Sequence, residues 1–154
     1  MARFAYVVAA SENYLPGVRA LLNSIEAVGS DADVILHAIC DALLGAAALG
    51  DIGRHFPDTD PNLKDISSLV LLANVMRLIG EQGWRVVNVD ATLIADRPKI
   101  AARAPEMVEK ISRVLEIDPS AVNVKATTTE GTGEVGSGAV MICHAVACIT
   151  RPAK

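Results

Sequence analysis

Aromatic residues and cysteines are scarce in this chain of 154 residues. Two Phe, two Tyr and one Trp account for its 3% of aromatic residues, so aliphatic side chains must build the core. The three cysteines, Cys40, Cys143 and Cys148, are an odd number and contain no CxxC pair. This pattern argues against a disulfide framework and against a thiolate zinc site. We expect three buried thiols in a reducing cytoplasm.

The chain also lacks long apolar runs and an excess of positive charge. No run approaches the roughly 18 apolar residues of a membrane span, and the net charge of -4 argues against a nucleic-acid surface built on bulk charge. A hydrophobic content of 51% excludes intrinsic disorder. A mean hydropathy of +0.36 favours apolar surface covered by a partner subunit. We expect one cytoplasmic domain, residues 1–154, without nucleic-acid or membrane partners.

Hydrophobic periodicity predicts an α+β fold with helices packed on one face of a mixed β-sheet. Alternating or short apolar runs predict strands, and apolar residues at helical spacing predict helices. Strands are expected at residues 4–10, 84–94, 122–126 and 139–149, and helices at 14–28, 34–49, 67–82 and 104–115. The Gly-, Pro- and Asp-rich residues 50–61 and the glycine-rich residues 130–138 are expected to be loops.

His37 is the first residue that could carry chemistry. It lies in the almost wholly apolar predicted helix, with Asp31, Asp33 and Asp41 around it and Asp51 beyond. A lone histidine in a core is usually only hydrogen-bonded, but neutral imidazole is also a good zinc ligand, especially with a carboxylate on its far nitrogen. Both interpretations stay open on the residues alone.

Two further stretches contain candidate ligand groups. The segment FPDTDP, residues 56–61, holds two carboxylates on a stiff frame, and is equally well explained as an Asx-turn or as a lid over a polar ligand. In ATTTEGTG, three threonines and Glu130 follow a predicted strand. Hydroxyls and free backbone N–H groups suit phosphate oxygens, and Glu130 suits a hard cation such as Mg²⁺.

Three long motifs resemble the 2-C-methyl-D-erythritol 2,4-cyclodiphosphate synthase family. They are SDADVILHAICDALLGAAALGDIGRHFPDTDP (30–61), NVDATLIADRPKI (88–100) and VNVKATTTEGTG (122–133), in order and with matching gaps. The resemblance implies a CMP-forming phosphorus–oxygen lyase of non-mevalonate isoprenoid biosynthesis. Its substrate would be 4-diphosphocytidyl-2-C-methyl-D-erythritol 2-phosphate, whose 2-phosphate attacks the β-phosphorus. It also implies a homotrimer with active sites between subunits, holding Zn²⁺ and Mg²⁺ or Mn²⁺.

The resemblance also assigns roles to individual residues. His37 would bind zinc and Glu130 the second cation, and Thr128 and Asp51 would be catalytic, with Thr128 polarising a phosphate. The substrate-binding residues it implies are Ser30, Asp51, Ile52, Gly53, Phe56, Pro57, Asp58, Thr59, Asp60, Ala95, Pro98, Lys99, Thr127, Thr128, Thr129 and Glu130. Of these, Ala95, Pro98, Lys99 and Thr127 would line the cytidine end.

The first 29 residues depart from the family pattern. The family's first strand carries Asp-x-His, which binds zinc together with the helix histidine, but Ala9 and Ser11 stand at those places. A family His-Ser pair is here Gly29-Ser30. Residues 1–29 resemble instead the start of a nucleotide-sugar glycosyltransferase. We therefore expect weak zinc binding and impaired turnover, with a non-catalytic trimeric scaffold or an engineered chimera of the same fold as the alternative.

Overall fold

A four-stranded mixed sheet organises the chain. The computed structural model describes residues 2–12, 30–57, 59–60, 63 and 66–152, so the helix predicted at 14–28 lies outside the described residues. The strands are β1 (Ala2–Glu12), β2 (Arg85–Ile94), β3 (Val122–Thr127) and β4 (Val140–Thr150). Their order is β1-β4-β2-β3, with β4 antiparallel to both neighbours and β2 parallel to β3.

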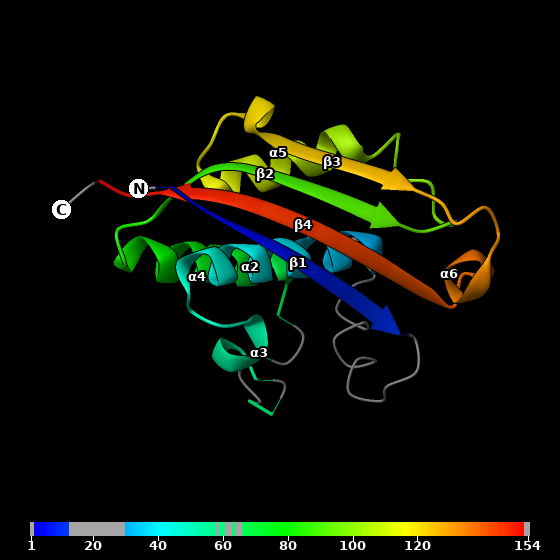
Figure 1. Ribbon diagram of the computed structural model, residues 1–154, viewed down its shortest axis with the longest axis horizontal. Coiled ribbons are helices and arrows are strands. Elements are labelled where there is room, and N and C mark those ends of the chain that lie inside the picture. Colours follow the sequence, from blue (N-terminus) through cyan, green and yellow to red (C-terminus); the bar gives the residue numbers. More distant parts are fainter. Residues whose placement is uncertain (1, 13–29, 58, 61–62, 64–65, 153–154) are drawn as a thin grey trace.

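The long helices pack on one face of this sheet, as the periodicity predicts (Figure 1). The helical elements are α2 (Ser30–Ala47), α3 (Ile52–His55), α4 (Ser68–Glu81), α5 (Ala104–Leu115), the 3₁₀ turn η3 (Pro119–Ala121) and α6 (Gly133–Ser137). Pro105 in the first turn of α5 favours helix initiation there, and Glu116, at φ 56°, ends the helix. The structure therefore has the expected α+β architecture.

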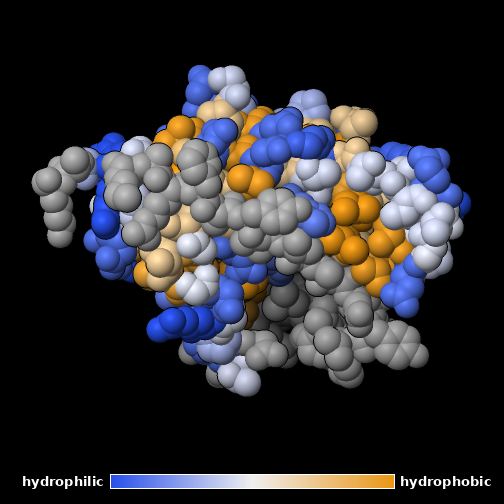
Figure 2. All heavy atoms as spheres, in the orientation of Figure 1, coloured by the Kyte–Doolittle hydropathy of each residue, from blue (hydrophilic) through white to orange (hydrophobic). Residues whose placement is uncertain are grey.

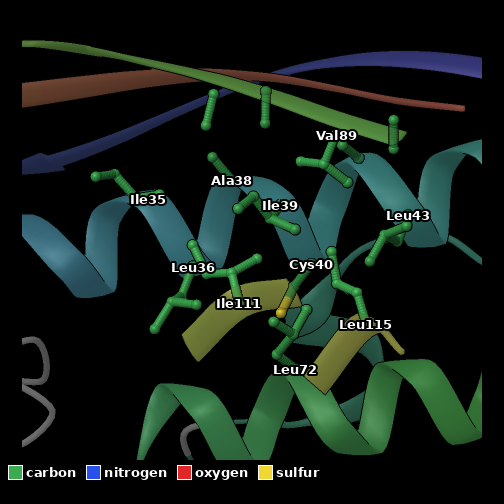
Figure 3. Packing of buried hydrophobic residues seen from close by; sticks show 14 of the residues in the cluster. Ile35, Leu36, Ala38, Ile39, Cys40, Leu43, Leu72, Val89, Ile111 and Leu115 are labelled. Carbon is green, nitrogen blue, oxygen red and sulfur yellow. The ribbon is translucent and has the colours of Figure 1, made fainter. Parts of the chain in front are cut away.

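Helix α2 is buried between the sheet and two other helices. Ala38 points toward the strands, whereas Leu36 and Cys40 lie beside Ile111 of α5 and Leu72 of α4 (Figure 3). Its apolar residues are 8% exposed or less, which confirms the prediction that a helix apolar nearly all round is a buried one. This burial holds His37, on the same helix, in a fixed place relative to α4.

The opposite face of the sheet carries no helix among the described residues. Ile94 of β2 pairs with Ile142 of β4, Thr92 pairs with His144, and all four side chains are half-buried. Hydrophobic patches lie between hydrophilic ones on the face that Figure 2 views. Within the described part of the chain, no helix combines the length and apolar character that a membrane span needs.

Two segments expected to be loops contain short helices. In residues 50–61, α3 forms because Asp51 caps its N-terminus: the Asp51 carboxylate accepts a hydrogen bond from the Arg54 N–H at 2.9 Å. In residues 130–138, α6 ends at Gly138, whose φ of 80° suits glycine. The prediction of loops is wrong at both places, because a single helical turn has no hydrophobic period to reveal it.

Candidate functional site

His37 and two neighbouring polar residues form the inner part of the candidate site. His37 Nε2 lies 3.2 Å from Ser68 Oγ, which α4 presents in its first turn. Asp33, one helical turn before His37, is only 6% exposed. Burial raises the pKa of the Asp33 carboxyl, against the opposing effects of the Ser68 hydroxyl and the His37 charge. Burial lowers the pKa of His37, so the neutral imidazole is favoured.

The described residues do not complete a zinc site around His37. Nowhere in that part of the chain do three His, Cys, Asp or Glu side chains gather closely enough to hold a metal ion. Catalytic zinc normally takes three protein ligands. One oxygen of Asp33, Oδ2, is buried without a hydrogen-bond partner among these residues. The assignment of His37 to zinc therefore stays a prediction.

Asp31, which also precedes His37, is committed to an ion pair. Its carboxylate accepts hydrogen bonds from both terminal nitrogens of Arg103, the residue just before α5, with one contact at 2.5 Å. The Asp31 side chain is 2% exposed and that of Arg103 41%. This pair joins the start of α2 to the start of α5, so we assign Asp31 a structural role.

The two carboxylates beyond His37 hold the start of α3. Asp41 Oδ1 accepts a hydrogen bond from the Ile52 N–H at 2.8 Å, and burial raises the pKa of Asp41 above its usual range. Asp51, predicted to be catalytic, uses its carboxylate as the cap described above. Gly53 is exposed and Ile52 half-buried in the same turn. The predicted residues 51–53 therefore form one rigid corner after α2.

The segment after α3 is only partly described. Phe56 is half-buried and packs against the core, while Pro57 and Thr59 are exposed. The Asp60 N–H donates to the Pro57 carbonyl at 3.1 Å, which makes a turn. Asp58 lies outside the described residues. An Asx-turn is defined by a side-chain hydrogen bond, so both the Asx-turn and the lid interpretation stay predictions.

A second group of predicted residues lies where the parallel strands β2 and β3 end. The Ala95 N–H donates to the Thr127 carbonyl at 3.0 Å and extends the strand ladder by one residue. Beyond it, the Thr128 hydroxyl donates to Glu130 Oε1 at 2.6 Å. Pro98, after a cis peptide bond, and Lys99 are exposed on the neighbouring loop. Thr128 and Glu130 therefore meet beyond the ends of the two strands, and Lys99 lies on the loop that follows β2.

Asp96 belongs to this second group, and the sequence analysis missed it. Its carboxylate accepts hydrogen bonds from the Thr129 N–H at 3.0 Å, the Thr129 hydroxyl at 2.9 Å and the Gly131 N–H at 2.9 Å. These donors, with a smaller effect of the Lys99 charge, hold the pKa of Asp96 below its usual range. Nothing in the local sequence singles out Asp96, because its partners lie in the segment after β3, more than 30 residues away.

Within one chain the corner at α3 and the second group lie apart. Figure 1 places α3 below the helices, well away from the carboxyl ends of β2 and β3. Ser30, a predicted substrate-binding residue, is the first residue of α2. On β1, Ala9 pairs with Cys143 and Ser11 with Met141, so these positions lie on the edge strand beside β4. The predicted metal ligands His37 and Glu130 belong to different groups.

Comparison with known proteins shows which family the chain resembles. The YgbB family matches residues 5–150. A 2-C-methyl-D-erythritol 2,4-cyclodiphosphate synthase from Nitrosospira multiformis is 60% identical over 122 residues, covering 79% of this chain and 69% of that protein. A bifunctional enzyme IspD/IspF from Anaeromyxobacter dehalogenans is 52% identical over 149 residues, covering 93% of this chain and 39% of that enzyme. The chain therefore spans about two fifths of the bifunctional relative.

A solved structure shows the same fold. The structure described as IspF from Plasmodium falciparum in complex with CDP aligns with 99% of this chain and 96% of that one, at 27% identity and a TM-score of 0.71. The family match begins at residue 5, so it includes most of residues 1–29, which precede the three motifs. The prediction that the likeness begins near residue 30 is too narrow, because β1 pairs with β4 as part of the same sheet.

Proposed function

Because this chain belongs to the YgbB family, whose relatives here are cyclodiphosphate synthases of the non-mevalonate pathway, we propose that it closes the same cyclic diphosphate. The substrate would be 4-diphosphocytidyl-2-C-methyl-D-erythritol 2-phosphate and the leaving group CMP. The observation that carries the proposal is the second group: the hydrogen-bonded pair Thr128–Glu130 lies just beyond the ends of two parallel strands. Ligands commonly bind at the carboxyl ends of parallel strands.

Phosphoryl transfer asks mainly for positioning and charge neutralisation. In the proposed reaction the Thr128 hydroxyl turns from Glu130 to a phosphate oxygen. Lys99, with Ala95, Pro98 and Thr127, holds the cytidine end, and the corner at Asp51 with the turn after it holds the methylerythritol part. These roles follow from the family resemblance and stay proposals.

A divalent cation fits the second group better than the first. Mg²⁺ is commonly held by one or two carboxylates together with substrate phosphates, and Glu130 offers one exposed carboxylate beside the threonine hydroxyls. When bound, such a cation would neutralise phosphate charge. The described residues around His37 do not match a three-ligand zinc site, so we derive no step through zinc.

We propose that the working form is a homotrimer with shared sites. Two observations support self-association: the sheet face without a helix among the described residues carries half-buried Ile94, Ile142 and Val146, and α3 lies away from the ends of β2 and β3. Light scattering at micromolar concentration should give three times 16.2 kDa. A stable monomer would contradict the shared site.

CDP binding and CMP release test the proposed function. Calorimetry with CDP and Mg²⁺ should show micromolar to millimolar affinity, and CMP release should fall in Thr128→Val but not in the control Thr150→Val, at the far end of β4. Absence of CDP binding at millimolar concentration would overturn the proposal.

Zinc content tests whether Ala9 and Ser11, which replace the family's Asp-x-His on β1, weaken metal binding. We expect substoichiometric zinc in the unmodified protein and about tenfold or more gain in turnover for the double variant Ala9→Asp, Ser11→His, equivalent to about 1.4 kcal/mol or more. Stoichiometric zinc with full turnover in the unmodified chain would show that other residues bind the metal. CDP binding without turnover in either protein would favour the non-catalytic scaffold.

A further inference from the structure

The segment that carries Thr128 and Glu130 adopts a backbone conformation that residues other than glycine seldom adopt. The Thr132 N–H donates to the Thr129 carbonyl at 3.0 Å, and the two residues between them, Glu130 and Gly131, have φ of 53° and 78°. Two successive positive φ angles define a type I′ turn. Glycine adopts this region freely, but glutamate does so only where its surroundings hold it.

Asp96 supplies that hold from the neighbouring strand. Asp96 directly follows Ala95. The Ala95 N–H donates to the Thr127 carbonyl and makes the last backbone hydrogen bond between the two segments. One carboxylate oxygen, Oδ2, accepts from the N–H and the hydroxyl of Thr129, and the other, Oδ1, accepts from the N–H of Gly131. Side-chain hydrogen bonds therefore continue the connection between the two segments where the backbone ladder ends.

These bonds fasten the segment on both sides of Glu130. The Gly131 N–H belongs to the peptide unit that follows Glu130, the Thr129 N–H belongs to the unit one residue earlier, and the Thr129 carbonyl between them accepts the Thr132 N–H, so the backbone at Glu130 has little freedom to rotate. The Glu130 carboxylate in turn accepts the Thr128 hydroxyl at 2.6 Å. Loss of Asp96 would release the strained glutamate and with it the alignment of both side chains.

We propose that Asp96 is a positioning residue, which holds the Thr128–Glu130 turn ready for the diphosphate and cation of a nucleoside diphosphate ligand. The nature of the ligand rests on the proposed function, whereas the hold on the turn does not. Asp96 acts through the turn and needs no contact with the ligand. Its effect is preorganisation, which improves affinity by removing the cost of ordering the loop at the moment of binding.

The test compares Asp96→Ala and Asp96→Asn with the matched control Asp118→Ala. Asp118 also accepts a backbone N–H, that of Ser120 at 2.8 Å, but at the opposite end of β3. Calorimetry measures CDP affinity over a range of Mg²⁺ concentrations, and NMR amide hydrogen exchange reports on Thr129 and Gly131. Thermal unfolding checks that each variant folds.

We expect Asp96→Ala to weaken CDP binding about 10-fold to 100-fold, the range typical of outer partners of ligand groups, and to raise the Mg²⁺ needed for half-maximal binding. Asp96→Asn, which keeps one acceptor oxygen, should fall between Asp96→Ala and the unmodified protein. Exchange at Gly131 should accelerate in both. Asp118→Ala should leave CDP affinity and Mg²⁺ dependence unchanged, because it touches neither segment.

Two results would overturn the inference. One is CDP affinity and Mg²⁺ dependence in Asp96→Ala equal to those of the unmodified protein. The other is unchanged amide exchange at Thr129 and Gly131, which would show that the turn holds itself. If the unmodified protein fails to bind CDP, the proposed function fails, and accelerated exchange in the variants still establishes the hold of Asp96 on the turn.

Discussion

A Cβ atom added to Gly136 would lie 2.1 Å from the carbonyl carbon of Gly131. Side chains do not approach a backbone so closely, so the two segments meet at a point that only glycine fits. Gly136 belongs to α6, and Gly131 belongs to the turn that Asp96 holds. The turn is therefore fixed from two sides, by the hydrogen bonds that it donates to Asp96 and by direct packing of α6.

Gly136→Ala should destabilise the protein, because the new methyl group must push the turn away from α6. We expect a loss of about 1–3 kcal/mol in the free energy of unfolding, the usual cost of overpacking. Gly80→Ala is the matched control, because nothing lies within 4 Å of its added Cβ in α4. It should raise stability by about 0.4–1 kcal/mol. Urea unfolding measures both, and equal effects would contradict the packing argument.

Arg103→Ala should destabilise the junction of α2 and α5. It leaves the buried Asp31 carboxylate without its partner, which we expect to cost about 1–3 kcal/mol. The control is Arg113→Ala, which removes an exposed pair with Glu109 on α5 and should cost about 0.5 kcal/mol or less. Chemical unfolding measures the free energy of unfolding of both variants. An equally small loss in Arg103→Ala would show that water replaces the guanidinium.

The cysteines should resist alkylation in the folded protein. Cys40, Cys143 and Cys148 are buried, and burial raises the pKa of Cys143 to about 12 and that of Cys40 well above its usual value. The reactive thiolate is therefore scarce at neutral pH. Iodoacetamide followed by mass spectrometry should label none of the three before denaturant and all three after it. Rapid labelling of Cys143 in the native protein would contradict its burial.

Asp96 should make part of the protein's stability depend on pH. Its pKa is lower in the folded protein than in the unfolded chain, because it accepts three hydrogen bonds as a carboxylate. The stabilisation is present above the unfolded pKa of about 3.8 and is lost as pH falls through the lower folded value. The stability difference between the unmodified protein and Asp96→Asn should therefore be constant at neutral pH and shrink in acid. A stability difference that grows in acid would contradict the prediction, because it would mean that folding raises the pKa of Asp96.

Much of the fold follows from residue periodicity, but the strand order does not. The alternation in β2, with Val89, Ala91 and Leu93 buried, predicts a strand with one core face. It says nothing about which strand lies beside it. The pairing of β1 with β4 joins the two ends of the described chain, a relationship that no local pattern encodes.

The candidate site shows the same limit. Thr128 and Glu130 could be found from residue type and the motif around them, because their chemistry is local. Asp96 could not, because its role depends on the parallel register that sets Ile94 beside Thr127. The engagement of Asp51 as a helix cap was also hidden, since α3 is a single turn that depends on that very cap.

The position of β4 between β1 and β2 has a consequence for how the protein is made. Residues 2–12 are synthesised well before residues 140–150, yet in the described sheet β1 pairs only with β4. The nascent first strand must therefore wait, unpaired, until nearly all of the domain has been synthesised. Such distant pairings slow folding and leave a strand edge open to wrong partners. Until residues 140–150 are synthesised, the edge of β1 stays without its partner strand and open to aggregation.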